Sequence, residues 1–306
     1  MKGPVLRLAT RGSALALWQA NYVKTRIEAS AGAPRVEIVP MKTSGDLIQD
    51  RALLEVGGKG LFVKEIQVAL LEGRADLAIH SLKDYPAENP EALVLACVPQ
   101  REDPRDALVL PQGSPLEALP RAARVGTGSL RRRHQALLLH PEWDVRGLRG
   151  NVETRLKKVD SGEIDAAVLA AAGLKRLGFG GRITRLFTVD EMIPAVGQGA
   201  LALEARGDDA RVLDLLRPLE DAEARLCVDA ERRFLRGLGG SCTTPLGIHA
   251  SVEGGRMVLR GFLSTVSGDL HIRDRAEGPS AGAEDLADAL LAAFMDRGAA
   301  SLLGEA

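Results

Sequence analysis

Aromatic residues are scarce in this chain of 306 residues: phenylalanine, tryptophan and tyrosine together make up 3% of it. So low a content argues against a surface on which nucleic-acid bases stack. An excess of charge is absent too, since 40 basic residues stand against 41 acidic ones. General binders of nucleic acid or of membrane surfaces carry a basic excess. We therefore expect neither nucleic acid nor membrane as a partner.

Cysteines are few, and Cys97, Cys227 and Cys242 are widely spaced, with no Cys-x-x-Cys pair. This pattern indicates neither a disulfide framework nor a zinc site, so we expect no bound metal. Cys97 and Cys227 stand in apolar runs and are expected in the core. Cys242 stands in the loop Gly-Gly-Ser-Cys-Thr-Thr-Pro. Spacing alone leaves a reactive thiol and a buried loop cysteine equally open there.

Long apolar runs are missing as well. Arg7 and Arg11 interrupt the N-terminal segment, which therefore lacks the apolar centre of a signal peptide. The longest apolar stretch, around residues 166–174, is far too short to span a membrane. With 45% hydrophobic and 26% charged residues, the chain has the composition of a globular protein, and we expect it to be soluble and cytoplasmic.

What the sequence does have is an alternation of β-like and helix-like runs, which predicts a mainly parallel sheet covered by helices. The pattern repeats after Pro104, so we expect two similar α/β halves. The segment 192–204 contains one Pro and two Gly ahead of a strand pattern, and we expect it to return the chain to the first half as a hinge. Beyond residue 218 the order changes to a helix, the cysteine loop, three alternating strands and a last helix over 284–303, which predicts an α+β unit.

Three predicted strand-to-helix turns combine small polar residues with arginine: residues 10–13, 127–133, and 149–151 with Arg155 one turn on. Helix N-termini attract anions, and arginine placed there is unfavourable unless an anion compensates. Of the 40 basic residues, 31 are arginine, whose planar fork suits carboxylates. One such turn is ordinary capping, but three together favour dispersed sites for a polycarboxylate.

Lys83 and Asp84 follow the apolar run 77–79, where a parallel strand ends and ligands commonly bind. A surface ion pair and a functional pair are equally open from this position. The segment 43–60 has glycine-rich ends around a polar centre, which fits a mobile lid with Lys59 at its inner edge.

In combination these segments resemble the porphobilinogen deaminase family. The matching stretches are RLATRGSALALWQA, VGGKGLFVKEI, ADLAIHSLKDYP, REDPRDALV, VGTGSLRRRHQ, LRGNVETRLKK, AAAGLKRLG, PAVGQGALALE and GGSCTTPLG. The resemblance implies an α/β fold of two lobes like those of periplasmic binding proteins, joined by hinge strands, and a smaller C-terminal α+β domain that carries the cofactor cysteine. The implied boundaries are 1–99 with 200–217, 100–199, and 218–306.

The resemblance also implies an enzyme that joins four porphobilinogen molecules head to tail, with loss of ammonia, to give hydroxymethylbilane for tetrapyrrole biosynthesis. Its primer would be a dipyrromethane cofactor attached by a thioether, which by position is on Cys242. Asp84 would be the catalytic carboxylate. The implied cofactor-binding residues are Ser81, Lys83, Asp84, Thr127, Gly128, Ser129, Arg131, Arg132 and Arg155. The implied substrate-binding residues are Arg11, Ser13, Lys59, Arg149, Arg155, Arg176 and Gln198.

The chain departs from the family pattern at three places. Gly128 stands where Ser or Ala is more common, Tyr85 where a small aliphatic residue is usual, and Ser241 where Gly is common. None removes a catalytic group. We expect a monomer. The competing hypotheses are a solute-binding protein built on the same two lobes, which the lack of an export signal disfavours, and a cysteine-dependent hydrolase.

Overall fold

The computed structural model describes residues 5–30, 32–43, 63–239 and 244–304. Lys59, Ser241 and Cys242 lie outside the described residues, as does most of the predicted lid. By the density of its internal contacts the chain divides into two compact units. The first comprises residues 1–102 and 200–225, and the second comprises residues 103–199 and 226–306.

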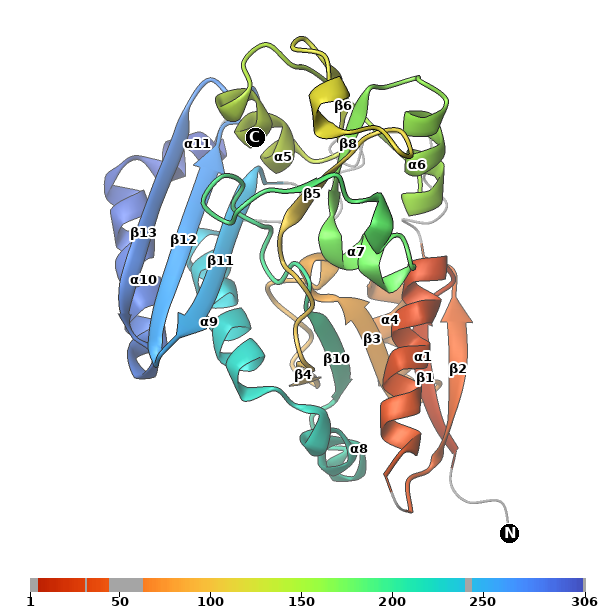
Figure 1. Cartoon of the computed structure of the whole chain (residues 1–306). Coiled ribbons are helices and arrows are strands. Elements are labelled where there is room, and N and C mark those ends of the chain that lie inside the picture. Colours follow the sequence, from red (N-terminus) through yellow and green to blue (C-terminus); the bar gives the residue numbers. More distant parts are fainter. Residues whose placement is uncertain (1–4, 31, 44–62, 240–243, 305–306) are drawn as a thin grey trace. The chain divides into compact units, whose positions relative to one another are not determined.

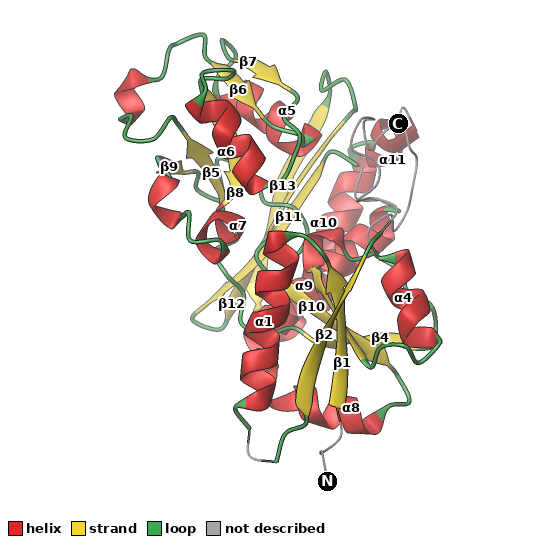
Figure 2. Cartoon of the chain, turned by 90° about the vertical axis from the view of Figure 1, so that its right-hand side faces the viewer, coloured by secondary structure: helices red, strands yellow, loops and turns green. Residues whose placement is uncertain are grey.

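The first unit is built on a five-stranded sheet in the order β2-β1-β3-β10-β4. Its strands are β1 (Val5–Arg11), β2 (Arg35–Met41), β3 (Leu77–Ser81), β4 (Leu93–Cys97) and β10 (Leu201–Arg206), and its helices are α1 (Ala14–Glu28), α4 (Lys64–Leu71) and α8 (Ala210–Leu216). β1 pairs in parallel with β2 and β3, whereas β10 runs antiparallel to β3 and β4. Figure 2 shows α1 and α4 on opposite sides of β1 and β2.

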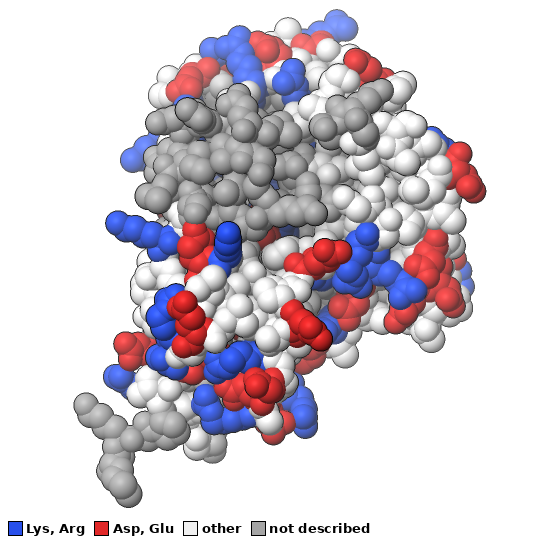
Figure 3. All heavy atoms as spheres, turned by 180° about the vertical axis from the view of Figure 1, so that it is seen from behind, with Lys and Arg blue, Asp and Glu red and all other residues white. Residues whose placement is uncertain are grey.

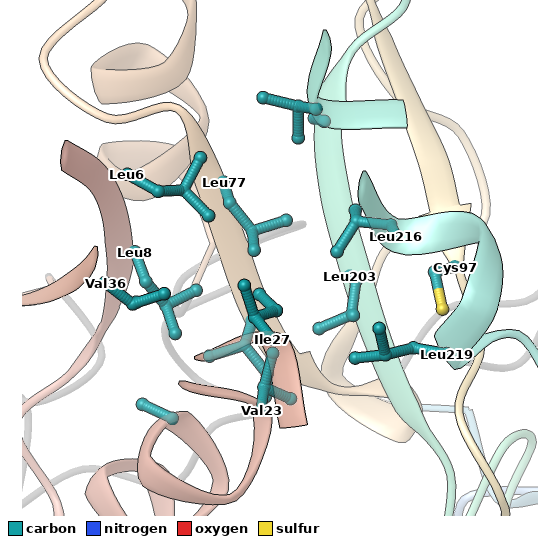
Figure 4. Close-up of a cluster of buried hydrophobic side chains, with 14 of the residues drawn as sticks. Leu6, Leu8, Val23, Ile27, Val36, Leu77, Cys97, Leu203, Leu216 and Leu219 are labelled. Atoms are coloured by element: carbon teal, nitrogen blue, oxygen red, sulfur yellow. The ribbon is translucent and has the colours of Figure 1, made fainter. Parts of the chain in front are cut away.

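Alternation along β1 decides which helix covers which face of this sheet. Leu6 and Leu8 pack with Val23 and Ile27 of α1 in a fully buried cluster (Figure 4). Ala9, the next residue along β1, points to the opposite face of the sheet and packs with the buried side chains of α4. Because successive strand residues point to opposite faces, the buried neighbours Leu8 and Ala9 show that this sheet is covered on both sides.

The second unit contains a sheet with the same pattern, in the order β7-β6-β8-β5-β9. Its elements are β5 (Asp106–Val109), β6 (Arg124–Gly126), α5 (Leu130–Leu139), β7 (Asp144–Arg146), α6 (Val152–Asp160), β8 (Ala166–Ala170), α7 (Ala171–Arg176) and β9 (Arg185–Leu186). β6 is parallel to β7 and β8, and β5 is antiparallel to β8 and β9. The fourth strand is therefore reversed in both sheets, as expected for two similar α/β halves.

The same unit carries an antiparallel sheet of three strands, which lie side by side in Figure 1. Its elements are α9 (Ala222–Leu238), β11 (Leu246–Glu253), β12 (Arg256–Ser264), β13 (His271–Pro279), α10 (Ala283–Asp296) and α11 (Ala299–Gly304). Phe234 of α9 meets Phe294 of α10 edge to face, with ring centroids 5.1 Å apart. This α+β part, together with the two α/β sheets, confirms the predicted fold class.

One predicted element is wrong. The single helix expected over 284–303 is two helices, α10 and α11, separated at Arg297 and Gly298. Gly298 has a φ of +86°, a left-handed conformation that only glycine adopts without strain and that ends a helix. The apolar residues keep their helical spacing across Arg297 and Gly298. The sequence pattern therefore predicted one continuous helix and missed the turn.

Two further expectations concern the core and the surface. Cys97 and Cys227 are buried, as predicted. Burial is the main cause that raises the pKa of the Cys97 thiol, and the nearby Glu220 carboxylate raises it further.

None of the described helices is long and apolar enough to cross a bilayer. On the face drawn in Figure 3, the described basic and acidic side chains are interspersed.

Candidate functional site

Three helix starts are capped by the residues that the sequence indicated. The Ser13 hydroxyl accepts a hydrogen bond from the Ala16 N–H at 3.3 Å, and the Ser129 hydroxyl accepts one from the Arg132 N–H at 3.5 Å. The Asn151 side-chain oxygen accepts from Thr154 N–H at 2.8 Å. Each cap satisfies one free donor of its helix, so the turns around them hold a defined shape.

Arg131 and Arg132, in the first turn of α5, share one carboxylate. The Asp106 carboxylate accepts from Arg131 Nη1 at 2.7 Å and from Arg132 Nε at 2.9 Å, and all three side chains are buried. Asp106 lies at the start of β5 and was not singled out as a site residue. The only sequence signal for it was its place in the stretch REDPRDALV.

Gln198 completes this group, which we call the Asp106 cluster: Asp106, Arg131, Arg132 and Gln198. Its amide nitrogen donates to Asp106 Oδ1 at 2.8 Å and to the Pro104 carbonyl at 2.6 Å. Its amide oxygen accepts from Arg132 Nη2 at 3.2 Å. Burial opposes ionisation of Asp106, but the two guanidinium groups and these hydrogen bonds outweigh it and hold the pKa of the carboxyl well below its usual range.

Positive charge remains in excess around this cluster. Arg155 of α6 donates Nε–H to the Gly150 carbonyl at 2.8 Å. Burial first, and then the positive charges of Arg132 and Arg149, lower the pKa of the Arg155 guanidinium to about 10. Among the described residues, the Asp106 carboxylate is the ion-pair partner of Arg131 and Arg132, and Arg149 and Arg155 add two further positive charges. An arginine whose pKa is depressed by other arginines indicates a place where an anionic ligand would be stabilised.

Arg176 and Thr127, two further predicted site residues of the second unit, are also buried. Arg176 Nη2 donates to the Gly199 carbonyl at 2.7 Å, next to Gln198. The Thr127 hydroxyl accepts from the Ser129 N–H at 3.3 Å. Gly128 between them is exposed, and a Cβ built there would lie 2.8 Å from the Leu148 carbonyl oxygen. The Ser or Ala that the family resemblance leads us to expect therefore does not fit this backbone without a shift.

The first unit holds a second group of predicted site residues, from β1, α1 and β3. Arg11 ends β1, and Ser81 ends β3, with its hydroxyl accepting from the Gln19 side-chain N–H at 2.9 Å. Lys83 and Asp84 follow in a short 3₁₀ turn, Leu82–Asp84, and both are partly buried. The structure pairs Asp84 with no hydrogen-bonding or ionic partner among the described residues, so the surface ion-pair hypothesis for Lys83 and Asp84 is not supported.

A buried carboxyl group behind this turn was missed by sequence reasoning. Glu204 of β10 is fully buried and accepts hydrogen bonds from Gln67 Nε2 at 2.7 Å and from the Tyr85 hydroxyl at 3.0 Å. Its other oxygen lies 3.0 Å from His80 Nε2. Glu204 is the last residue of the quoted stretch PAVGQGALALE, but nothing in the sequence assigned it partners from α4, from β3 and from the turn that ends at Tyr85.

The structure thus groups the predicted residues in two sets. The second-unit set contains Arg131, Arg132, Arg149, Arg155, Arg176, Gln198, Thr127, Gly128 and Ser129. The first-unit set contains Arg11, Ser13, Ser81, Lys83 and Asp84. Among the described residues no His, Cys, Asp and Glu side chains gather as a metal site. The chemistry offered is that of arginine forks and hydroxyls for carboxylates, and of the Asp84 carboxylate, which has no partner within the described part of the chain, for a positive charge.

Two family models and two known proteins match this chain over most of its length. Residues 6–214 match the family described as porphobilinogen deaminase, dipyromethane cofactor binding domain, and residues 225–296 match the porphobilinogen deaminase C-terminal domain. The porphobilinogen deaminase of Syntrophotalea carbinolica is 49% identical over 99% of this chain and 97% of its own. That of Thiobacillus denitrificans is 49% identical over 97% of each. Among solved structures, a nutrient-binding protein of Burkholderia cenocepacia bound to methionine is 12% identical, covers 69% of this chain and 90% of its own, and has a TM-score of 0.43.

Proposed function

The chain belongs to the porphobilinogen deaminase family, an enzyme family that polymerises porphobilinogen into hydroxymethylbilane in tetrapyrrole biosynthesis, and we propose which of its residues carry that reaction. Asp84 is the catalytic carboxylate. The arginines of the second unit hold acidic side chains of the pyrroles. Dipyrromethane is attached by a thioether to Cys242, and the enzyme acts as a cytoplasmic monomer. We further propose three domains, comprising residues 1–99 with 200–217, residues 100–199, and residues 218–306.

The observation that carries the proposal is the uncompensated positive charge around the Asp106 cluster. Every pyrrole ring of porphobilinogen and its products bears two carboxylates. Four arginines close to a single aspartate, with the pKa of Arg155 lowered first by burial and then by its arginine neighbours, suit such a polyanion. The same residues fit the dipyrromethane group, which carries the same carboxylates. When bound, that group supplies the pyrrole carbon at which the first substrate is joined.

The binding residues fall into two groups, one for the cofactor and one for the incoming substrate. Arg131 and Arg132, fixed by Asp106 and Gln198, hold cofactor carboxylates together with Ser81, Lys83, Thr127, Gly128, Ser129 and Arg155. Arg11, Ser13, Lys59, Arg149 and Arg176 meet the incoming substrate, and Gln198 orients the arginines. Side chains that are held before the ligand arrives lose less freedom when it binds.

Asp84 acts where positive charge develops on the substrate. Ammonia leaves the aminomethyl group of porphobilinogen, and the remaining methylene-pyrrole is cationic. The pyrrole at the end of the growing chain then forms the new C–C bond and loses a proton from the bonded carbon. A fixed carboxylate beside the pyrrole nitrogens stabilises both transition states without moving. Its lack of an ionic partner among the described residues leaves the Asp84 charge available for this role.

An intact mass spectrum of the purified chain tests the proposal. We expect wild-type protein to be heavier than its sequence by one dipyrromethane unit. Cys242→Ser should lack the added mass and be inactive, whereas the matched controls Cys97→Ala and Cys227→Ala should retain both the mass and activity. A wild-type chain that is active without added mass contradicts the cofactor assignment.

A further inference from the structure

The turn that carries Lys83 and Asp84 is fixed at both of its ends by one segment of the chain. At the start, the Leu82 N–H donates to the Ala200 carbonyl at 3.1 Å. At the end, the Tyr85 hydroxyl donates to the Glu204 carboxyl at 3.0 Å. Ala200 immediately precedes β10 and Glu204 lies within it. Both ends of the turn are therefore attached to one short segment, which is itself hydrogen-bonded to β3.

The second anchor, the Glu204 carboxyl group, is held in place because both of its oxygens have partners. Besides Tyr85 it accepts from Gln67 of α4, and it lies against His80 of β3. The rings of His80 and Tyr85 are 5.5 Å apart between centroids. A carboxyl group in the interior is tolerated only when hydrogen-bonded, and a fully satisfied buried network restricts the positions of all its members.

The side chain of Asp84, in contrast, makes no hydrogen bond or ion pair with the described residues. Its location is therefore set by the backbone of the turn, and the residue after it is the anchored Tyr85. A displacement of about 1 Å at a catalytic group costs up to 10²-fold in rate. An anchor one residue away is thus well placed to control catalysis.

We propose that Tyr85 is a positioning residue for the reaction, and that its hydroxyl, held on Glu204, sets the place of the Asp84 carboxylate. The inference rests on the proposed catalytic role of Asp84.

The test is steady-state kinetics of Tyr85→Phe, which removes the hydroxyl and keeps the ring beside His80. We expect kcat to fall by about 3- to 10-fold, as for the loss of one buried hydrogen bond, with KM changed less than twofold and the cofactor mass retained. Tyr22→Phe is the matched control, because Tyr22 is the other tyrosine of the chain and, among the described residues, its hydroxyl accepts from the exposed Arg26 side chain, at 3.3 Å. It should keep wild-type kcat.

Asp84→Asn and the double variant Tyr85→Phe/Asp84→Asn separate the two hypotheses. If Tyr85 acts through Asp84, the double variant turns over no more slowly than Asp84→Asn alone. Wild-type kcat in Tyr85→Phe beside an inactive Asp84→Asn overturns the positioning role and leaves the proposed function standing. Additive losses, or a lower melting temperature with unchanged kcat, likewise overturn it, because they mark a purely structural residue. Near-normal turnover of Asp84→Asn instead contradicts the proposed role of Asp84 itself.

Discussion

The Glu231 carboxylate of α9 accepts a hydrogen bond from the backbone N–H of Gly197 at 2.6 Å. Its other oxygen accepts from the Ala250 N–H of β11 at 2.9 Å. One fully buried side chain therefore joins the helix that leads to the cysteine loop, a strand of the antiparallel sheet, and the residue beside Gln198. Through Gln198 this connection reaches the Asp106 cluster.

Glu231→Ala should lower the free energy of unfolding by about 3 kcal/mol, because two buried backbone donors lose their acceptor. Glu231→Gln, which keeps one acceptor oxygen, should lose less. Urea unfolding followed by circular dichroism measures both. The control is Glu223→Ala in the exposed first turn of the same helix, expected to cost less than about 1 kcal/mol. Equal losses at the two positions would contradict the structural reading of Glu231.

Asp106→Asn should cost about 3–5 kcal/mol at neutral pH, because Arg131 and Arg132 stay buried without their counter-charge. The folded-state pKa of Asp106 is lowered relative to an unfolded value of about 3.9. Its contribution is therefore fully present above about pH 4 and is lost as the pH falls through the folded value. The difference in unfolding free energy between wild type and Asp106→Asn should shrink correspondingly in acid.

The control for Asp106 is Asp144→Asn, which removes the carboxylate of an exposed pair with Arg146. Exposed pairs contribute less than about 1 kcal/mol. Its unfolding free energy should follow that of wild type from pH 7 to pH 3. A difference for Asp106→Asn that stays constant across this range would show that the carboxyl is not ionised in the folded protein.

Gly128→Ser should destabilise this chain. The added Cβ meets a backbone carbonyl, that of Leu148, at 2.8 Å, and such crowding costs about 1–3 kcal/mol. Gly147→Ala is the matched control, since its Cβ would meet no atom within 4 Å. Thermal unfolding compares the two variants. A Gly128→Ser protein as stable as wild type would mean that the turn yields at no cost.

Asp84→Asn should retain the fold and the added mass but lose turnover by about 10²- to 10³-fold, since it keeps the shape and removes the charge. Asp84→Glu keeps the charge one methylene away and should retain partial activity. Glu88→Gln, an exposed carboxylate four residues on, is the control and should be fully active. Single-turnover release of ammonia is the measurement. Near-normal release by Asp84→Asn would assign the carboxylate a structural role.

Local features of this fold were predictable because their causes lie within a few residues. Ser13, Ser129 and Asn151 cap their helices through donors three residues away, so the capping pattern alone identifies them. The alternation of strands and helices predicted two α/β halves for the same reason. It failed at Gly298, where periodicity continues across a turn that depends on one backbone angle.

The sequence by itself determined the residue types of the site and, through its motifs, the family. Only the tertiary structure decided which partner each charge has. Asp106 lies 25 residues from Arg131, and His80 lies 124 residues from Glu204. No periodicity distinguishes an arginine that meets solvent from one that is paired with a buried carboxylate. Such pairs form because burial makes an unpaired charge costly, and which groups are buried together depends on how the strands and helices pack.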